Sequence, residues 1–424
     1  MIPTACPDCR SARLYGHGTN GQTYRDTPMH GKTVQIRVNR RRYRCQNRGK
    51  TLFDPIPDLD GKRLATTRLV AYVRSTCFRE TFAVVARRVA MDEKTVRQIL
   101  ADYVEELETT IQFVTPRLMG IDEIKIIGEY RCMITNLEHL TLFDMRATRR
   151  KPVLLAYFNG LRDKDQVEWV AMDMYHVYRQ VVRATLPQAR IVVDRFHIQR
   201  MANDALEKLR KRLRKTLPER QRLKLKDERF LLLRRLHDLK PEAARRMLEW
   251  FQRFPELGEA HALKEGFLAL WDQTNRPAAE AAYATWHGNV TPGMQPVFKD
   301  LLTAVANWRD EIFAYFEQPL TNAYTESVNN LAKGMNRMGR GYSFDVIRAR
   351  MLYDPKSRKA GSVVVTVPVK DEGPSTFEYV IPGRPRPPVR VRRRVIEYGP
   401  HIPTLVKLLE EGYFEQNDME SELG

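Results

Sequence analysis

The sequence predicts a mixed α/β core that is interrupted by an all-helical insertion and preceded by two small modules. Between residues 116 and 199, short apolar runs that read as strands alternate with helical stretches. Residues 200–320 are rich in Leu, Arg and Ala at helical spacing and show almost no strand pattern. The first 60 residues carry paired cysteines and a strand-like alternation, which is typical of a small separate module.

The charge balance indicates a polyanionic partner. The 424 residues include 71 Lys and Arg against 52 Asp and Glu, which gives a formal net charge of +19. Because cations that neutralise phosphates release counterions, a chain this basic is expected to bind nucleic acid. No apolar run of about 18 residues appears and the chain does not begin with an apolar stretch. We therefore expect a cytoplasmic protein without a membrane partner, associated with the nucleoid when bound to DNA.

Residues 1–60 are predicted to form a Cys-containing, ribbon-like module. Cys6 and Cys9 lie in a Cys-Pro-Asp-Cys pair, and Cys45 follows in RRRYRC. In a reducing compartment such thiols bind metal more often than they form disulfides, so we expect either a zinc site or none. His17 and His30 are the candidates for a fourth ligand. The alternation VQIRVNRRRYRC reads as a strand with a basic face, which suits DNA contact with or without zinc.

Residues 61–115 are predicted to form a helix-turn-helix domain. In FAVVARRVAMDEKTVRQIL, small residues at Ala86 and Ala90 and core-facing Val96 and Ile99 have the spacing of two helices joined by a tight turn. Asp92 is placed to cap the second helix. The outward side chains of that helix are the candidates for DNA contact: Lys94, Thr95, Arg97 and Gln98. A plain helical hairpin is the alternative interpretation.

Acids interrupt or follow the apolar runs of the first core segment, residues 116–199. Asp122 lies inside the run 118–127, Asp173 lies near the end of 168–174, and Asp194 follows the last run and precedes His197. A buried strand rarely tolerates an acid without a functional reason, and ligand sites gather at the carboxyl ends of parallel strands. The remaining strands and helices of this segment are predicted at 130–137, 140–146, 152–161 and over YHVYRQVVRATLP.

The segment 321–353 places one acid among cations. If the segment is helical, its polar face carries Glu326, Asn330, Lys333 and Arg337, and its apolar face carries Val328, Leu331, Met335 and Met338. An acid surrounded by bases suits a divalent cation held against phosphate, with Lys333 and Arg337 as DNA contacts. Asp122, Asp173 and Glu326 would be the ligands of Mg²⁺ or Mn²⁺ in two-metal phosphoryl transfer. Each acid has an alternative interpretation as a helix cap or an ion-pair partner.

The remaining segments are predicted to support DNA contact. The insertion 200–320 carries a basic helical stripe, and Trp271 and Trp286 are expected in its core more than on DNA bases. Residues 354–424 form a basic extension with a proline-rich, extended part. Its arginines Arg392, Arg393 and Arg394 are expected to contact phosphates.

Three stretches together resemble the DDE transposases of bacterial insertion sequences, specifically the ISL3 family. They are the strand with Asp122, the stretch MDMYHVYRQVVRATLPQARIVVDRFHI, and the helix TNAYTESVNNLAKGMNRMGRGYSFDVIRARMLY. The resemblance implies an RNase H-like catalytic core with divalent metal, in which the second acid follows the fourth strand. Strand counting then favours Asp173, while Asp194 and His197 resemble an auxiliary (Cys or Asp)-x-x-His element and Asp194 stays the alternative second acid. The family pattern has a Cys where this chain has Arg48.

The resemblance implies a transposase that binds the terminal inverted repeats of an insertion sequence and cuts and joins DNA. A homodimer on double-stranded DNA, the inverted repeats and the target, is the expected assembly. A nuclease of the same fold without joining activity is one alternative. A helix-turn-helix regulator with an inactive catalytic domain is another, and the presence of Asp122, Asp173 and Glu326 speaks against it.

Overall fold

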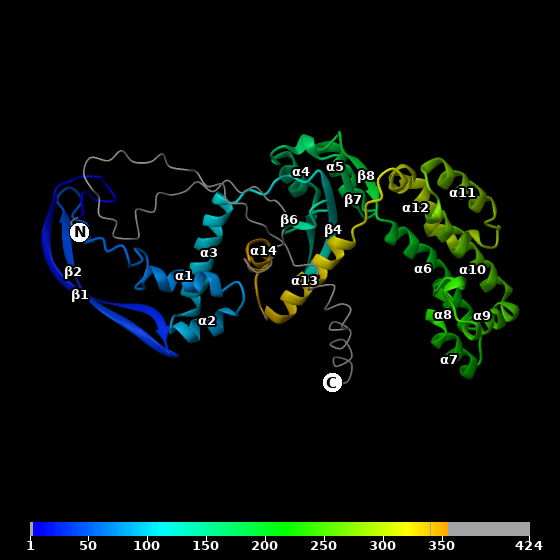
Figure 1. Cartoon of the computed structure of the whole chain (residues 1–424), viewed down its shortest axis with the longest axis horizontal. Helices are drawn as coiled ribbons and strands as arrows, with labels where there is room; N and C mark the ends of the chain where they lie inside the picture. Colours follow the sequence, from blue (N-terminus) through cyan, green and yellow to red (C-terminus); the bar gives the residue numbers. More distant parts are fainter. Residues whose placement is uncertain (1–2, 340, 355–424) are drawn as a thin grey trace, which may run out of the picture. The chain divides into compact units, whose positions relative to one another are not determined.

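The computed structural model of the chain describes residues 3–339 and 341–354. These residues divide into two compact units (Figure 1). One unit joins residues 3–113 to 339 and 341–354, and the other spans 114–338. In the described ranges, no helix has the length and apolar character needed to cross a membrane. The predicted basic extension, with Arg392, Arg393 and Arg394, lies outside the described residues.

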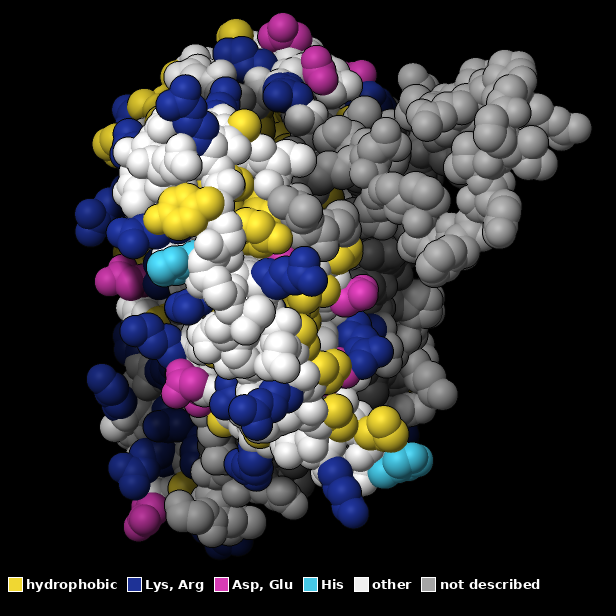
Figure 2. Space-filling model, turned by 90° about the vertical axis from the view of Figure 1, so that its left-hand side faces the viewer, with side chains coloured by type: hydrophobic (Ala, Val, Ile, Leu, Met, Phe, Trp, Pro, Cys, Tyr) yellow, Lys and Arg dark blue, Asp and Glu magenta, His cyan; other side chains and the backbone are white. Residues whose placement is uncertain are grey.

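A long antiparallel hairpin begins the first unit. Its sheet has the order β1-β2-β3, formed by β1 (Leu14–Met29), β2 (Lys32–Cys45) and β3 (Thr51–Phe53). His30 and Gly31, both with positive φ, connect β1 to β2. Exposed and partly covered side chains alternate along β2, so Arg37 and Arg41 face solvent as the sequence pattern predicts. Figure 2 faces this end of the molecule and shows Lys and Arg side chains spread over it.

Helices complete the first unit: α1 (Thr67–Thr76), α2 (Phe82–Val89), α3 (Glu93–Thr110) and α14 (Phe344–Tyr353). Asp92 accepts a hydrogen bond from the Lys94 N–H and caps α3, as predicted. Ala90 ends α2 in the left-handed conformation at φ 51°, a position that glycine fills at lower cost. Val96 and Ile99 are fully buried between the helices. The predicted pair of helices joined by a tight turn is therefore present.

Helix α14 packs with the helices that precede the core rather than with the core itself. The Arg350 guanidinium donates to the Cys77 carbonyl at 2.6 Å, and the Tyr342 ring meets the Phe82 ring edge to face. Arg348 pairs with Glu108 on α3. The grouping differs from the sequence-based division, which joins residues 321–353 to the core.

The second unit is built on a five-stranded mixed sheet in the order β6-β5-β4-β7-β8. Its strands are β4 (Leu118–Ile126), β5 (Glu129–Asn136), β6 (Thr141–Arg146), β7 (Trp169–Met172) and β8 (Arg190–Val193), and its connections contain α4 (Lys151–Asn159), the 3₁₀ turn η1 (Lys164–Gln166) and α5 (His176–Thr185). β4, β5 and β6 form an antiparallel meander, whereas β7 and β8 run parallel to β4. The strands lie where the apolar runs predict them, because each run is bounded by turn residues.

The insertion is helical throughout, as predicted (Figure 1). Its elements are α6 (Arg195–Arg214), α7 (Glu219–Asp227), α8 (Arg229–Leu233), η2 (Leu236–Asp238), α9 (Pro241–Arg253), α10 (Pro255–Leu268), η3 (Ala269–Asp272), α11 (Arg276–Gly288), α12 (Gln295–Phe313) and η4 (Ala314–Phe316). Trp286 is buried and its indole N–H donates to the Leu263 carbonyl at 2.7 Å. Trp271 stacks on Phe316. Both tryptophans thus pack inside the insertion, in agreement with the sequence-based expectation.

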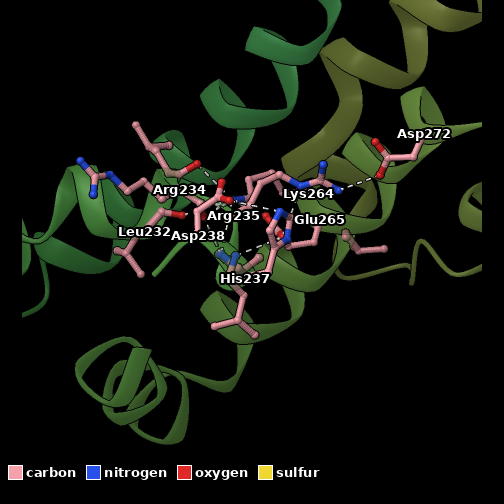
Figure 3. A network of polar contacts seen from close by, with 12 residues as sticks. Leu232, Arg234, Arg235, His237, Asp238, Lys264, Glu265 and Asp272 are labelled. Carbon is pink, nitrogen blue, oxygen red and sulfur yellow. Dashed lines mark hydrogen bonds and ion pairs between the residues drawn. The ribbon is translucent and has the colours of Figure 1, made fainter. Parts of the chain in front are cut away.

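A buried lysine fastens α8 to α10 (Figure 3). The Lys264 side chain is fully buried, and its ammonium group donates to the carbonyls of Leu233 at 3.2 Å and Arg234 at 2.9 Å. These carbonyls end α8 and have no partner within that helix. Burial lowers the pKa of Lys264, and Glu265 lies 2.8 Å from its nitrogen. The lysine therefore stabilises a five-residue helix that is too short to persist alone.

Helix α13 (Ala323–Gly339) follows the insertion and returns to the sheet. The sequence-based apolar face was wrong in part: Val328 is buried, but Leu331 and Met335 are only partly covered and Met338 is 73% exposed. The buried stripe instead combines Val328 and Ala332 with polar side chains. The reason is that this helix docks on the sheet through hydrogen bonds as well as apolar contact.

Candidate active site and thiol cluster

Three aspartates stand at the same level of adjacent parallel strands. Ile121 on β4 pairs with Met172 on β7, which pairs with Val193 on β8. The residues that directly follow these three are Asp122, Asp173 and Asp194, respectively. Two of them follow the carboxyl ends of β7 and β8, where α/β sheets carry ligand sites. The fold therefore gathers the acids that the sequence singles out.

Asp194 is engaged in joining elements. It caps α6 by accepting from the Phe196 N–H at 3.2 Å, and its second oxygen accepts from the Asn322 N–H at 3.3 Å. Asp194 is buried, so both contacts are shielded from water. The carboxylate links the end of β8 to the residue that precedes α13.

Asp173 faces a cavity of about 380 Å³. The lining residues are Glu123, Asp173, Met174, Tyr175, Tyr178, His197, Arg200 and Met201. Nε2 of His197 lies 2.6 Å from Oδ1 of Asp173. Burial, followed by the charges of Asp122 and Asp194, raises the pKa of Asp173 to about 8. Burial lowers the pKa of His197.

Asp122 and Glu326 complete the acidic site. Asp122 is buried inside β4, and burial is the main reason that its pKa rises to about 7, with a further contribution from Glu326. Glu326 lies on the first turn of α13 and is partly exposed. Burial and the charge of Asp194 raise the pKa of Glu326. The acids thus resist ionisation mainly because they are buried, and neighbouring negative charges add to the effect.

Polar residues that the sequence analysis did not name hold α13 against β4. Asn329 donates to Oδ2 of Asp122 at 2.7 Å, and Asn322 donates to the Ile121 carbonyl at 3.0 Å. The hydroxyl groups of Thr325 and Thr135 are 2.8 Å apart. Asn322, Thr325 and Asn329 are spaced by three and four residues, so the sequence carries this stripe, but its residues are polar and do not follow the apolar pattern that marks a buried helix face.

Gly120 makes the approach of α13 to β4 feasible. A Cβ atom at this position would lie 2.5 Å from Oγ1 of Thr135 and 2.7 Å from Oγ1 of Thr325. Both distances are far below van der Waals contact. Glycine at this place in β4 is therefore a requirement of the helix that carries Glu326.

The three carboxylates Asp122, Asp173 and Glu326 are not gathered to ligand distance as a set. Among the described residues, one set of three Cys, His, Asp or Glu side chains has ligand atoms within 4.8 Å of one another, and it consists of Cys6, Cys9 and Cys45. Asp122, Asp173 and Glu326 share charge effects but do not meet this criterion. Their side chains would have to move to bind one ion together.

The thiol cluster lies at the open end of the first unit's hairpin, where β1 begins and β2 ends. Sγ of Cys9 is 3.5 Å from Sγ of Cys45, and Cys6 and Cys45 are buried. The backbone N–H groups of Cys9 and Asp8 lower the pKa of Cys6, which favours the thiolate that a metal requires.

Neither histidine joins the thiol cluster, so the structure contradicts the proposed fourth ligand. His30 lies at the turn between β1 and β2, at the opposite end of the hairpin from Cys45. His17 lies on β1, with its ring against Tyr15. The exposed Arg48 follows Cys45 in a turn. The physical reason is the length of the paired strands, which carries His30 away from the thiols.

The candidate DNA contacts are presented on two helices, one in each unit. On α3, Lys94, Arg97 and Gln98 are exposed and Thr95 is partly covered. Arg97 pairs with Glu93 and Gln98 donates to Asp102, so both side chains have partners on their own helix. On α13, Lys333 and Arg337 are exposed.

Comparison with known proteins identifies the class. The transposase family model DDE_Tnp_ISL3 matches residues 119–351, and a model for the zinc-finger of transposase IS204/IS1001/IS1096/IS1165 matches residues 2–47. The chain is 23% identical over 355 residues to the transposase for insertion sequence element IS1001 of Bordetella parapertussis, covering 81% of this chain and 87% of that protein. It is 24% identical over 370 residues to the transposase for insertion sequence element IS1557 of Mycobacterium tuberculosis, covering 80% and 82%.

These matches define an insertion-sequence transposase, a class of protein that acts on DNA. The chain belongs to the ISL3 family of DDE transposases. The resemblance seen in the sequence is thereby confirmed.

Proposed function

We propose that residues 114–338 form an RNase H-like catalytic core in which Asp122, Asp173 and Glu326 bind divalent metal and cut and join DNA. The observation that carries the proposal is the strand register that sets Asp122 beside Asp173. Asp122 lies on β4, the first strand of the core, and Asp173 directly follows β7, the fourth strand. Asn329 supports the third role, because it donates to Asp122 from the helix that carries Glu326. The strand register and this hydrogen bond bring residues that are far apart in sequence to one end of the sheet.

The acids fit Mg²⁺ or Mn²⁺ by their chemistry. Carboxylate oxygens are the ligands these cations prefer. The pKa of each of the three acids is raised by burial and by its acidic neighbours, so a cation would relieve a repulsion that the protein maintains. Bound metal would activate the attacking hydroxyl and stabilise the leaving oxygen.

The choice of Asp173 over Asp194 as second acid is supported by what each carboxylate contacts. Asp194 accepts from the Phe196 N–H, which caps α6, and from the Asn322 N–H at the start of α13. Asp173 borders the cavity and contacts the side chain of His197. We assign Asp173 to metal and Asp194 to holding the fold, with His197 orienting the Asp173 carboxylate.

We further propose that the amino-terminal modules bind the terminal inverted repeats. The helix pair α2 and α3 would read bases through Lys94, Thr95, Arg97 and Gln98 as a helix-turn-helix, and the basic face of β2 would contact phosphates. Zn²⁺ held by Cys6, Cys9 and Cys45 would stabilise the hairpin. A homodimer is expected, because transposition must hold two element ends together.

The test uses full-length protein and DNA that carries the ends of its element. Asp122→Asn and Glu326→Gln should reduce Mg²⁺-dependent cleavage by roughly 10³-fold or more, because each removes a metal ligand. Binding to the ends should stay near the wild-type level, since the amino-terminal modules are untouched. Cleavage at the wild-type rate by either variant would refute the proposed site.

A joined product separates transposition from plain nuclease activity. Water as nucleophile yields hydrolysis, whereas the 3′-hydroxyl of an element end yields strand transfer. Incubation of precut ends with a target plasmid should yield joined molecules. Cleavage without any joining would favour the nuclease alternative.

A further inference from the structure

Arg149 lies beside the cavity of the candidate active site. Its guanidinium pairs with Glu123, whose side chain lines the same cavity as Asp173. The guanidinium carbon is 4.0 Å from the centre of the Tyr130 ring and 4.7 Å from that of Tyr175. Contact with two aromatic rings restricts the orientation of a planar cation, so Arg149 is held in place before any ligand arrives.

Most of the hydrogen-bonding capacity of Arg149 is unused. A guanidinium has five N–H donors. Within the described residues Arg149 donates one hydrogen bond, from Nη1 to Glu123. The side chain is 27% exposed, so Arg149 lies within reach of a ligand that enters from solvent.

Structural stabilisation is a weak explanation for this arrangement. Both partners of the ion pair are partly exposed, Arg149 at 27% and Glu123 at 32%, and pairs of this kind contribute little to stability. Yet the pair places a second acid next to Asp122 in sequence and next to Asp173 in the cavity. A positioned cation with spare donors at the edge of an acidic cavity suits an anionic ligand.

We propose that Arg149 binds a backbone phosphate of the DNA strand being cut, adjacent to the scissile phosphate. Its ion pair with Glu123 breaks when the phosphate binds. The guanidinium fork matches two phosphate oxygens, which is why arginine serves so often at such contacts. In the absence of DNA, Glu123 forms an ion pair with the guanidinium group. This role rests on the proposed function, because it requires the cavity to receive the cleaved strand.

Substitutions of Arg149 and Glu123 are expected to change the affinity for end DNA in opposite directions. On a chain carrying Glu326→Gln, which keeps the DNA intact, Arg149→Ala should weaken binding to end DNA roughly tenfold. Glu123→Gln should strengthen it, because the competing carboxylate charge is gone. Arg150→Ala is the matched control: this exposed neighbour lies in the same loop, and its loss should have a smaller effect. Equal weakening by Arg149→Ala and Glu123→Gln would identify a merely structural ion pair and overturn the proposal.

A phosphate scan locates the contact. Single methylphosphonates, each removing one phosphate charge, replace the phosphates around the cleavage position of the end DNA. At one or two positions the substitution should weaken binding by the Arg149 chain but leave the Arg149→Ala chain unaffected, while the Arg150→Ala chain keeps its sensitivity. Arg149→Lys, which retains the charge, should show an intermediate response, and it serves in place of Arg149→Ala if that variant does not fold.

The failure of this role and the failure of the catalytic site give different results. If Arg149→Ala stays as sensitive as its parent at every position scanned, Arg149 does not contact a phosphate, whatever the activity of the protein. If the Glu326→Gln chain itself cuts the DNA during the binding measurement, the metal site is assigned wrongly.

Discussion

The thiols of the first unit and the carboxylates of the second differ in how completely each set is assembled. Cys6, Cys9 and Cys45 have their ligand atoms within 4.8 Å of one another. Asp122 and Asp173 are aligned by strand register, but with Glu326 they do not form such a set of three. Thiols are neutral when protonated and can pack together without an ion, whereas neighbouring carboxylates repel one another as soon as they ionise.

The difference teaches what each site is built for. A structural metal site is closed, and its ligands converge because the hairpin brings them together. The proposed catalytic site must leave room for substrate. Burial and acidic neighbours raise the pKa of Asp122 and Asp173, and a bound cation would offset their negative charge. Each of the following tests would break or sharpen this contrast, beginning with the largest expected effect.

Substitutions at Asp173 and Asp194 should separate chemistry from architecture. Asp173→Asn should reduce cleavage by roughly 10³-fold with little change in folding, because a metal ligand is lost. Asp194→Asn keeps one acceptor oxygen, which can serve the N–H of Phe196 or that of Asn322 but not both, so it should lose some stability and keep part of its activity. Asp194→Ala loses both buried hydrogen bonds and should lower the free energy of unfolding by about 1–3 kcal/mol. Cleavage rates and thermal melts measure the two effects.

The opposite outcome at these aspartates is equally clear. A folded but inactive Asp194→Asn, together with an active Asp173→Asn, would make Asp194 the second acid.

Zinc in the amino-terminal module should depend on the thiols and not on the histidines. Cys45→Ser should abolish a bound zinc equivalent and destabilise the hairpin, because metal affinity in such modules is coupled to folding. His17→Ala and His30→Ala should retain the metal, since neither imidazole lies in the cluster. Elemental analysis of the purified proteins is the measurement. Loss of zinc from either histidine variant would mean that the hairpin rearranges when metal binds.

The acidic site should make stability depend on pH and on Mg²⁺. The folded pKa values of about 7 for Asp122 and about 8 for Asp173 lie above the unfolded value near 3.9. The folded chain therefore binds more protons, and without metal this site should lose stability as pH rises from about 4 to about 8.

Added Mg²⁺ should reverse that loss. At roughly 100 times its dissociation constant, a ligand of the folded state adds about 2.7 kcal/mol. The rise in melting temperature should be larger near pH 8.5 than near pH 6, because deprotonated carboxylates bind the cation. The same series on Asp173→Asn is the control, in which most of the Mg²⁺ response should vanish. An equal response in both proteins would place the cation elsewhere.

We expect α3 of the first unit to read bases and α13 of the second unit to contact phosphates. Arg97→Ala on α3 should narrow the difference in affinity between end DNA and random DNA, as a base contact contributes about 1–3 kcal/mol. Lys333→Ala on α13 should weaken binding to both DNAs and reduce the salt slope by about 0.9. Binding curves at several salt concentrations compare them. Equal loss of affinity for both DNAs in Arg97→Ala, with a reduced slope, would make Arg97 a phosphate contact.

The strands, the helical insertion and the thiol pair were predictable from sequence, because each depends on residues close together in the chain. Apolar runs bounded by turn residues located β4 to β8, and Asp92 was recognisable as a cap from its place before α3. The acids stood out because burial of a charge inside an apolar run needs a reason.

The partners of those acids were decided only by tertiary structure. Asn322 and Asn329 bond to β4 residues some 200 positions away in the sequence, and an apolar pattern does not reveal such polar contacts. Asp173 and Asp194 follow similar apolar runs and differ in their contacts. Asp173 borders a cavity and lies beside His197, whereas Asp194 accepts from two backbone N–H groups. Periodicity records which side of an element faces inward, whereas hydrogen bonds between distant segments depend on how the whole chain packs.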